Sequence, residues 1–161
     1  MSATDTGSVQ AQWALIAQAV ARSRAAPLSP RRAMGAVVAL DQLCDLAFDA
    51  RGGLAQPFAG MPDILAFRAA LRAHSPALGL VMDLGAAAKD GPWLEVVDWQ
   101  VAPQDMGALP VVDLMVSLYG GGQVPRLAVA QAGRAIVLVQ SLFDLAIADL
   151  KALMPMVSGQ Q

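Results

Sequence analysis

The sequence predicts an α+β protein in which a small, mostly antiparallel sheet is flanked by helices and preceded by a helical N-terminal extension. Three observations support this fold class. Apolar residues recur at helical spacing near both ends of the chain. Aromatic and β-branched residues alternate with others over residues 93–101, which favours a strand. Two apolar runs, residues 124–130 and 135–140, are joined by a short loop containing Gly133, which is typical of a β-hairpin.

Two helices are expected in the N-terminal part. The first spans residues 9–22, where apolar residues recur at i, i+3, i+4 and i+7. The second spans residues 31–48 and carries a wide apolar stripe. Residues 1–7 are small and polar, and we expect them to be disordered. The apolar positions of the first helix are Trp13, Ile16, Ala17 and Val20.

Three carboxylates form a ridge on the second helix. Asp41, Asp45 and Asp49 lie at i, i+4 and i+8. Such a ridge indicates either a paired-carboxylate site or an acidic face in contact with solvent. The solvated face is the favoured interpretation, because no histidine or further acid is spaced to join these residues as ligands.

Residues 49–62 are expected to form a loop, because the segment contains several Gly and Pro residues. Its apolar residues predict that it packs against the rest of the protein. We take this loop as the boundary between a helical extension, residues 1–60, and an α+β domain, residues 61–161.

The α+β domain is expected to begin with a helix over residues 63–74, which Asp63 caps and Pro76 stops. Residues 77–84 alternate in hydropathy and predict a strand. A further strand is predicted over residues 93–101, which two prolines bracket.

A helix is predicted from Pro110 to Tyr119. Proline is well tolerated at a first helical position, and the glycines from Gly120 to Gly122 end the helix. Its apolar residues follow the i, i+3, i+4, i+7 spacing of a helix with one buried face. They are Val112, Met115, Val116 and Tyr119.

The final helix is expected over residues 141–154, after the hairpin. Ser141 and Asp144 resemble a capping box at its start. Residues 155–161 resemble a tail. The apolar face of this helix consists of Leu142, Ala146, Leu150 and Leu153.

The composition is unusually apolar. Hydrophobic residues make up 56% of the chain, against roughly 45–50% in typical globular domains. Aromatic residues are few, so the excess consists of Ala, Val, Leu and Met. Either a general compositional bias or an apolar surface that faces a partner explains this excess.

The charge balance argues against nucleic acid as a partner. The net charge is −2 and the pI is about 5.1, so no broad basic face is available to neutralise phosphates. The group from Arg22 to Arg32 is the one candidate basic patch, and we expect it to be a solvated helix end and linker.

Several features favour a cytoplasmic protein. Cys44 is the only cysteine, so no disulfide forms within the chain, which fits a reducing compartment. The first cation is Arg22, so the charged start of a signal peptide is missing. No apolar run of about 18 residues occurs, so a membrane span is not expected.

No catalytic, cofactor-binding or metal-binding constellation is predicted. His74 is the only histidine and follows a helix, where unreactive histidines are common. Cys44 lies in an apolar stripe, and one Cys with one His is too few for a zinc site. A small enzyme with a site around His74, Glu95 and Asp98 is the least favoured hypothesis.

The C-terminal part resembles the class I type III secretion chaperones, the Tir-chaperone family. The resemblance covers about residues 63–154 and rests on a Gly-x-Leu-Pro turn, a helix with paired Leu, a Gly-containing hairpin and a closing amphipathic helix. The family order is helix, three strands, helix, two strands, helix. The matching stretches are Gly107–Pro110, Leu114–Leu118, Leu127–Val139 and Leu142–Leu153.

The resemblance implies a bacterial homodimer without covalent chemistry, which binds an extended segment of a secreted protein by strand addition. The helix from Pro110 to Tyr119 would then close the dimer, although its apolar residues are equally well explained as ordinary core. The residues expected at the partner or dimer interface are Val112, Met115, Val116, Tyr119, Trp93, Trp99, Leu127 and Val129.

The favoured functional hypothesis is a non-enzymatic bacterial chaperone or adaptor that binds an extended segment of a partner protein and requires no cofactor. The alternative is a structural or accessory subunit of a larger bacterial assembly, which uses the same apolar surface permanently.

Overall fold

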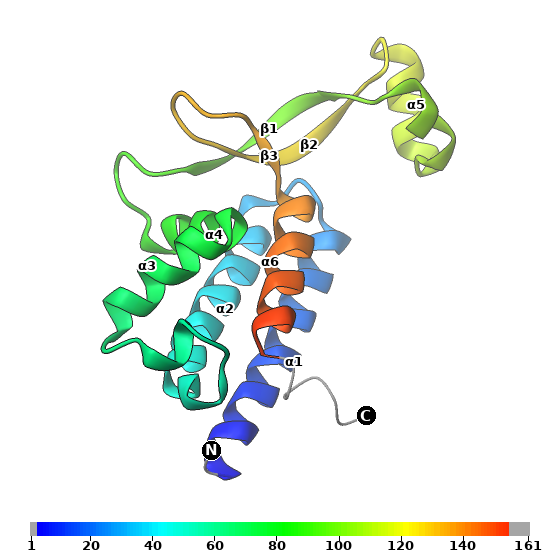
Figure 1. Ribbon diagram of the computed structural model, residues 1–161. Helices are drawn as coiled ribbons and strands as arrows, with labels where there is room; N and C mark the ends of the chain where they lie inside the picture. The colour runs from blue at the N-terminus through cyan, green and yellow to red at the C-terminus, as the bar shows by residue number, and fades with distance from the viewer. Residues whose placement is uncertain (1–2, 155–161) are drawn as a thin grey trace.

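The computed structural model describes the backbone of residues 3–154 and side chains from residue 7 onward, and it confirms the α+β class. A body of packed helices carries a three-stranded antiparallel sheet at one end (Figure 1). The α-helices are α1 (Ala3–Ala25), α2 (Pro30–Asp49), α3 (Ile64–His74), α4 (Pro76–Ala86), α5 (Val111–Tyr119) and α6 (Val139–Leu153). The strands are β1 (Trp93–Gln100), β2 (Gln123–Ala130) and β3 (Val137–Leu138), and short 3₁₀ helices span Arg51–Gly53, Phe58–Gly60 and Pro103–Ala108.

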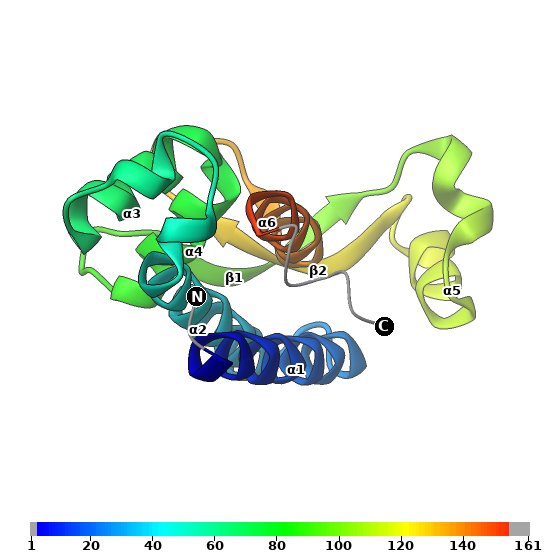
Figure 2. The same cartoon turned by 60° about the horizontal axis from the view of Figure 1, so that its bottom comes forward.

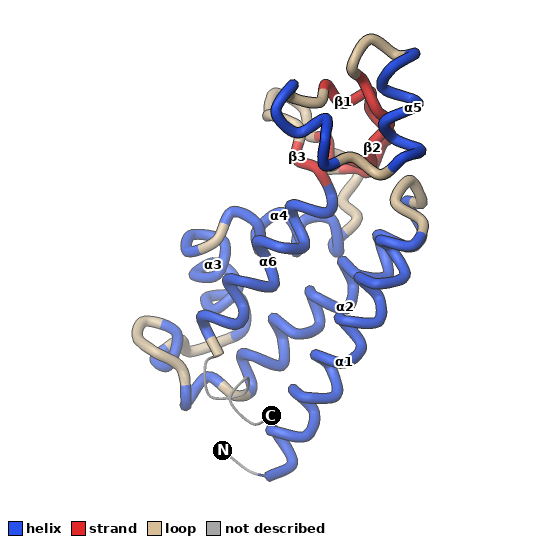
Figure 3. Tube along the Cα trace, turned by 90° about the vertical axis from the view of Figure 1, so that its right-hand side faces the viewer, coloured by secondary structure: helices blue, strands red, loops and turns tan. Residues whose placement is uncertain are grey.

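Helices α1 and α2 form an antiparallel hairpin (Figures 1 and 3). Ser29 caps α2 by accepting a hydrogen bond from the backbone N–H of Arg32, and Pro30 is the first helical residue. Gln12 Nε2 donates to the carbonyl of Ala39 at 2.7 Å, which ties the two helices together. Both predicted helices are confirmed. The first is longer than expected, so residues 3–7 are helical rather than disordered, and residues 1–2 lie outside the described residues.

The predicted strand over residues 77–84 is wrong, because this segment is helix α4. Ser75 accepts a hydrogen bond from the N–H of Leu78 at 3.1 Å, and Pro76 begins α4 in addition to ending α3. Asp63 caps α3 as predicted. Helix α4 is buried on most sides, and periodicity alone does not distinguish a short buried helix from a buried strand. Its buried residues are Ala77, Leu78, Gly79, Val81, Met82 and Leu84.

The sheet has the order β1-β2-β3. Strands β1 and β2 pair along their whole length, from Trp93 opposite Ala130 to Gln100 opposite Gln123. The second hairpin strand is much shorter than predicted, since only Val137 and Leu138 belong to β3.

The final helix begins two residues earlier than predicted, at Val139, and the predicted capping box is wrong. Ser141 lies inside α6, and no side chain caps the helix start. Val139 is buried together with Leu142, Phe143 and Ala146, so the apolar stripe of α6 already includes it. Residues 155–161 lie outside the described residues.

Most of the buried apolar residues form one hydrophobic cluster, which joins α1, α2, α3, α4, α6 and β2. The segment predicted as an interdomain loop, residues 49–62, packs against this cluster through Phe58, whose ring meets Phe67 edge-on at 5.8 Å between centroids. Core residues therefore lie in one cluster on both sides of the predicted boundary.

Strands β1 and β2 continue beyond the helical body and carry α5 at their far end (Figures 1 and 2). We refer to residues 101–122, which include α5 and the preceding 3₁₀ helix, as the arm. No helix among the described residues has the length and apolar character needed to cross a membrane.

Candidate interaction surfaces

Helix α5 turns its polar side toward its own chain. Ser117 is the only buried residue of the helix, and its Oγ lies 3.4 Å from Met106 Sδ. Asp113, on the same side, accepts a hydrogen bond from Arg126 Nη2 of β2 at 2.8 Å. These polar contacts fix α5 to the sheet and leave six of its seven large apolar side chains exposed.

The apolar side of α5 faces away from the protein. At 100° per residue, its exposed apolar residues cover an arc of about 160°. They are Val111, Val112, Met115, Val116, Leu118 and Tyr119, and their exposed fractions range from 42% to 88%. The four predicted interface residues of this helix belong to the arc, so they are not part of the chain's own core. We call these six residues the outward arc.

Glycines close the arm and return the chain to β2. Gly121 and Gly122 have φ angles of +66° and +87°, a region in which a side chain would be strained. The N–H of Gly122 donates to the carbonyl of Ser117 at 2.9 Å, and the Gly122 carbonyl accepts from the N–H of Val101 at 3.0 Å. The orientation of α5 is therefore set by backbone bonds at its end and by the Asp113–Arg126 pair.

Strand β1 presents a second candidate surface. It lies at the edge of the sheet, and no strand among the described residues pairs with its outer side. Trp93, Val96 and Trp99 are 46%, 50% and 38% exposed. The indole N–H of Trp93 donates to Glu95 at 3.1 Å. An unpaired edge with exposed aromatic residues offers backbone groups and side-chain contacts to an added strand.

Two of the predicted interface residues lie elsewhere. Leu127 and Val129 are buried and pair with Val96 and Leu94 of β1. Since directly opposed residues share a face, this face of the sheet is the one that covers the helical body. The side chains of Leu127 and Val129 therefore belong to the hydrophobic cluster.

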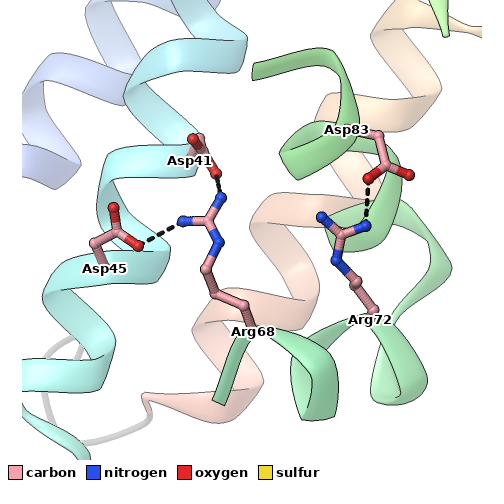
Figure 4. Close-up of polar contacts among 5 residues, drawn as sticks. All are labelled: Asp41, Asp45, Arg68, Arg72 and Asp83. Atoms are coloured by element: carbon pink, nitrogen blue, oxygen red, sulfur yellow. Dashed lines mark hydrogen bonds and ion pairs between the residues drawn. The ribbon is translucent and has the colours of Figure 1, made fainter. Parts of the chain in front are cut away.

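Two carboxylates of the acidic ridge of α2 form ion pairs with an arginine of α3. Arg68 of α3 binds both Asp41 and Asp45, each at 2.5 Å, and Arg72 pairs with Asp83 of α4 (Figure 4). Asp45 and Asp49 are exposed, as the solvated-face interpretation expects, whereas Asp41 is half-buried against Arg68. Arg68 and Arg72 lie one turn apart on an adjacent helix, and this spacing was the sequence signal that could have predicted ion pairs with nearby carboxylates.

Burial dominates the electrostatics of this cluster. It raises the pKa of Asp41, and the opposing effect of the Arg68 charge and hydrogen bond is smaller. Burial also raises the pKa of the neighbouring Cys44 thiol to about 12. Cys44 is thus protonated at neutral pH, which is unfavourable for a nucleophile.

The residues of the enzyme hypothesis do not converge. His74 ends α3, where its ring meets Phe58 edge-on at 5.5 Å between centroids. Glu95 and Asp98 lie on opposite faces of β1, because residues an odd number apart alternate across a strand. Among the described residues, no group of three His, Cys, Asp or Glu is arranged to hold a metal ion.

Two hollows mark the surface of the body, and sequence reasoning found neither. One, of about 570 Å³, lies between α4, the β2–β3 loop and α6, and Arg72, Asp83 and Arg134 contribute its charges. The other, of about 620 Å³, is a groove between α1 and α2. Arg22, Arg31 and Arg32 contribute the charges of this groove.

Comparisons with protein-family models, curated proteins and solved structures found no match. The arm helix, the hairpin and the closing helix follow one another in sequence, and β1 is the one described strand between α4 and the arm. Functional argument therefore rests on the surfaces themselves.

Proposed function

We propose that this protein is a non-enzymatic chaperone or adaptor that forms a homodimer through α5 and binds an extended segment of a partner protein along β1. The observation that carries the proposal is the outward arc. A surface helix normally turns its apolar side inward, whereas α5 turns its polar side inward and leaves six large apolar residues exposed. Contiguous apolar surface of this kind typically marks a protein interface.

A second copy of the chain is a suitable partner for the outward arc. Two such helices related by a two-fold axis present the same residues to each other, which is an isologous contact. Helix α5 has nine residues, or about 13 Å of length, which is short for a stable interface on its own. The contact is therefore expected to extend to Trp99, at the arm end of β1.

The other end of β1 is left for a client segment. Trp93 is the first residue of β1 and Val96 the fourth, so both precede Trp99 and the arm. An extended segment paired with the outer edge of β1 would gain main-chain hydrogen bonds, while its alternate side chains contact Trp93 on one face and Val96 on the other. In the form that the family resemblance implies, the client is a bacterial type III secretion substrate bound in the cytoplasm.

The alternative function, a subunit of a larger assembly, uses the outward arc permanently. It predicts higher oligomers or poor solubility when the chain is produced alone, whereas the chaperone proposal predicts a stable dimer. Size-exclusion chromatography with light scattering on the purified chain distinguishes the two.

Client binding is tested by site-specific photo-crosslinking in the producing cell. A photoreactive residue at Val96 is expected to crosslink one partner through a segment that is extended and unstructured when free. The control places the same residue at Lys151, an exposed position of α6. Equal crosslinking from both positions would show that β1 has no preference for a client.

A further inference from the structure

The groove between α1 and α2 combines an apolar floor with an uncompensated positive end. Ala19, Gly35 and Ala39 contribute small side chains, and Leu15 and Val38 are 53% and 44% exposed beside them. A Cβ added at Gly35 would meet nothing within 4 Å, so the space above it is open. Figures 2 and 3 show that α1 lies along one side of α2 at the outside of the body.

Two of the three arginines of the groove lie where helix electrostatics disfavour a cation. Arg31 and Arg32 are in the first turn of α2, which contains no acidic residue. The partial positive charge of a helix N-terminus repels cations and attracts anions. Arg22, in the last turn of α1, adds a third cation to the same end.

None of the three guanidinium groups is neutralised within the described residues. The ion pairs found there involve Arg24, Arg68, Arg72 and Arg126 instead. Arg32 Nη1 donates only to the carbonyl of Arg22, at 3.4 Å. Positive charge is thus concentrated at one end of an apolar groove in a chain whose net charge is −2.

We propose that the α1–α2 groove binds an acidic amphipathic helix of a protein partner, at a site separate from the arm and β1. A helix is the suitable shape, because a third helix packs naturally along the groove of an antiparallel pair when the residues between them are small. From Arg31 to Gln42 the groove follows α2 for about 16 Å, or three turns of a bound helix. The apolar stripe of the bound helix lies over Ala19, Gly35 and Ala39, and the carboxylates at one end of that helix meet the arginines of the groove.

The probe is a labelled peptide of about 15 residues with Leu at helical spacing and three Glu in one terminal turn. Two control peptides carry Lys in place of Glu, or the same residues in scrambled order. Fluorescence anisotropy with the full chain is expected to show saturable binding of the acidic amphipathic peptide and weak binding of both controls. Equal binding of the scrambled peptide would overturn the proposal, because charge alone would then explain it.

The groove variant combines Arg22→Glu, Arg31→Glu and Arg32→Glu, and it is expected to bind the acidic peptide at least about tenfold more weakly. The matched control reverses three exposed cations elsewhere, with Lys89→Glu, Arg134→Glu and Lys151→Glu, and is expected to bind like the wild type. The two changes in the first turn of α2 favour its dipole, and Arg22→Glu in the last turn of α1 opposes the dipole of that helix, so the groove variant is expected to melt close to the wild type.

The remaining outcomes also decide the question. If the groove variant changes the oligomeric state, the groove binds a second copy and the proposal is wrong. If anionic phospholipid vesicles or duplex DNA bind through these arginines while the peptide does not, the partner is of another class and the proposal is likewise wrong. A Val112→Asp variant is expected to retain peptide binding, so failure here is distinguishable from failure of the dimer.

Discussion

Val112 and Leu65 occupy the same place in two different helices. Each is the second residue of its helix, α5 or α3, and their side chains are 74% and 77% exposed. In the proposed dimer Val112 is covered by the partner subunit, whereas Leu65 remains in solvent. A Val112→Asp variant and a Leu65→Asp variant therefore apply nearly the same local change, and only the first is expected to weaken association.

The expected effect of Val112→Asp follows from the apolar surface that the dimer would bury. Complete burial of a Val side chain contributes roughly 1.5–3 kcal/mol. Since about three quarters of Val112 is exposed in the isolated chain, its burial contributes about 1–2 kcal/mol per subunit. The change occurs twice in a symmetric dimer, so we expect a loss of about 2–4 kcal/mol and a dissociation constant about 30- to 700-fold higher.

Sedimentation equilibrium over a range of protein concentrations measures this constant for the wild type and both variants. The reasoning fails if Val112→Asp associates like the wild type, or if Leu65→Asp weakens association equally. A wild-type chain that stays monomeric at high concentration would refute the dimer itself.

Three further predictions concern the stability of the body. Burial raises the pKa of Cys44 from 9.0 to about 12, so between these values the folded state holds a proton that the unfolded state has lost. This effect on the unfolding free energy is absent below pH 9. Above pH 9 the unfolding free energy falls by about 1.4 kcal/mol per pH unit more steeply than in a Cys44→Ala variant. Urea titrations at several pH values measure this, and the same pH dependence in both proteins would contradict it. Ser75 Oγ accepts from Leu78 N–H and donates to Asp149 at 2.5 Å, so Ser75→Ala is expected to cost about 1–2 kcal/mol in urea unfolding, and an unchanged midpoint would count against the bond. Gly35→Ala, in open space, is expected to stabilise α2 by about 0.5–1 kcal/mol. Gly85→Ala is expected to lack this gain, because its Cβ would lie 2.9 Å from Asp41 Oδ2; equal melting temperatures for the two variants would disprove the distinction.

Local chemistry made much of the fold predictable. The cap at Asp63, the proline before α5 and the glycines after it each act within a few residues, so the sequence reveals them directly. The boundaries of β1 and α5 follow from the same signals. Where an element is buried on most sides, as α4 is, its polar face is too narrow to reveal its period, and the apolar run was interpreted as a strand.

The direction in which a face points was not predictable in the same way. Periodicity showed that Val112 and Met115 share one side of α5, but the orientation of that side depends on Asp113 meeting Arg126 of β2. The groove depends likewise on α1 folding back along α2, which brings Arg22 beside residues of the α2 N-terminus. Tertiary contacts of this kind leave no mark in the spacing of one segment.

Because α5 supplies one buried side chain while the hydrophobic cluster lies in the body, the subunits are expected to remain folded when they separate. Obligate homodimers lose their fold on dilution, and their melting temperature varies with protein concentration. Here dilution is expected to lower the melting temperature only until the dimer has dissociated, after which the folded subunit melts at a constant temperature. Two differently tagged populations would then exchange subunits on mixing without unfolding. When one population carries a variant of β1, the mixed dimers have one intact β1 edge.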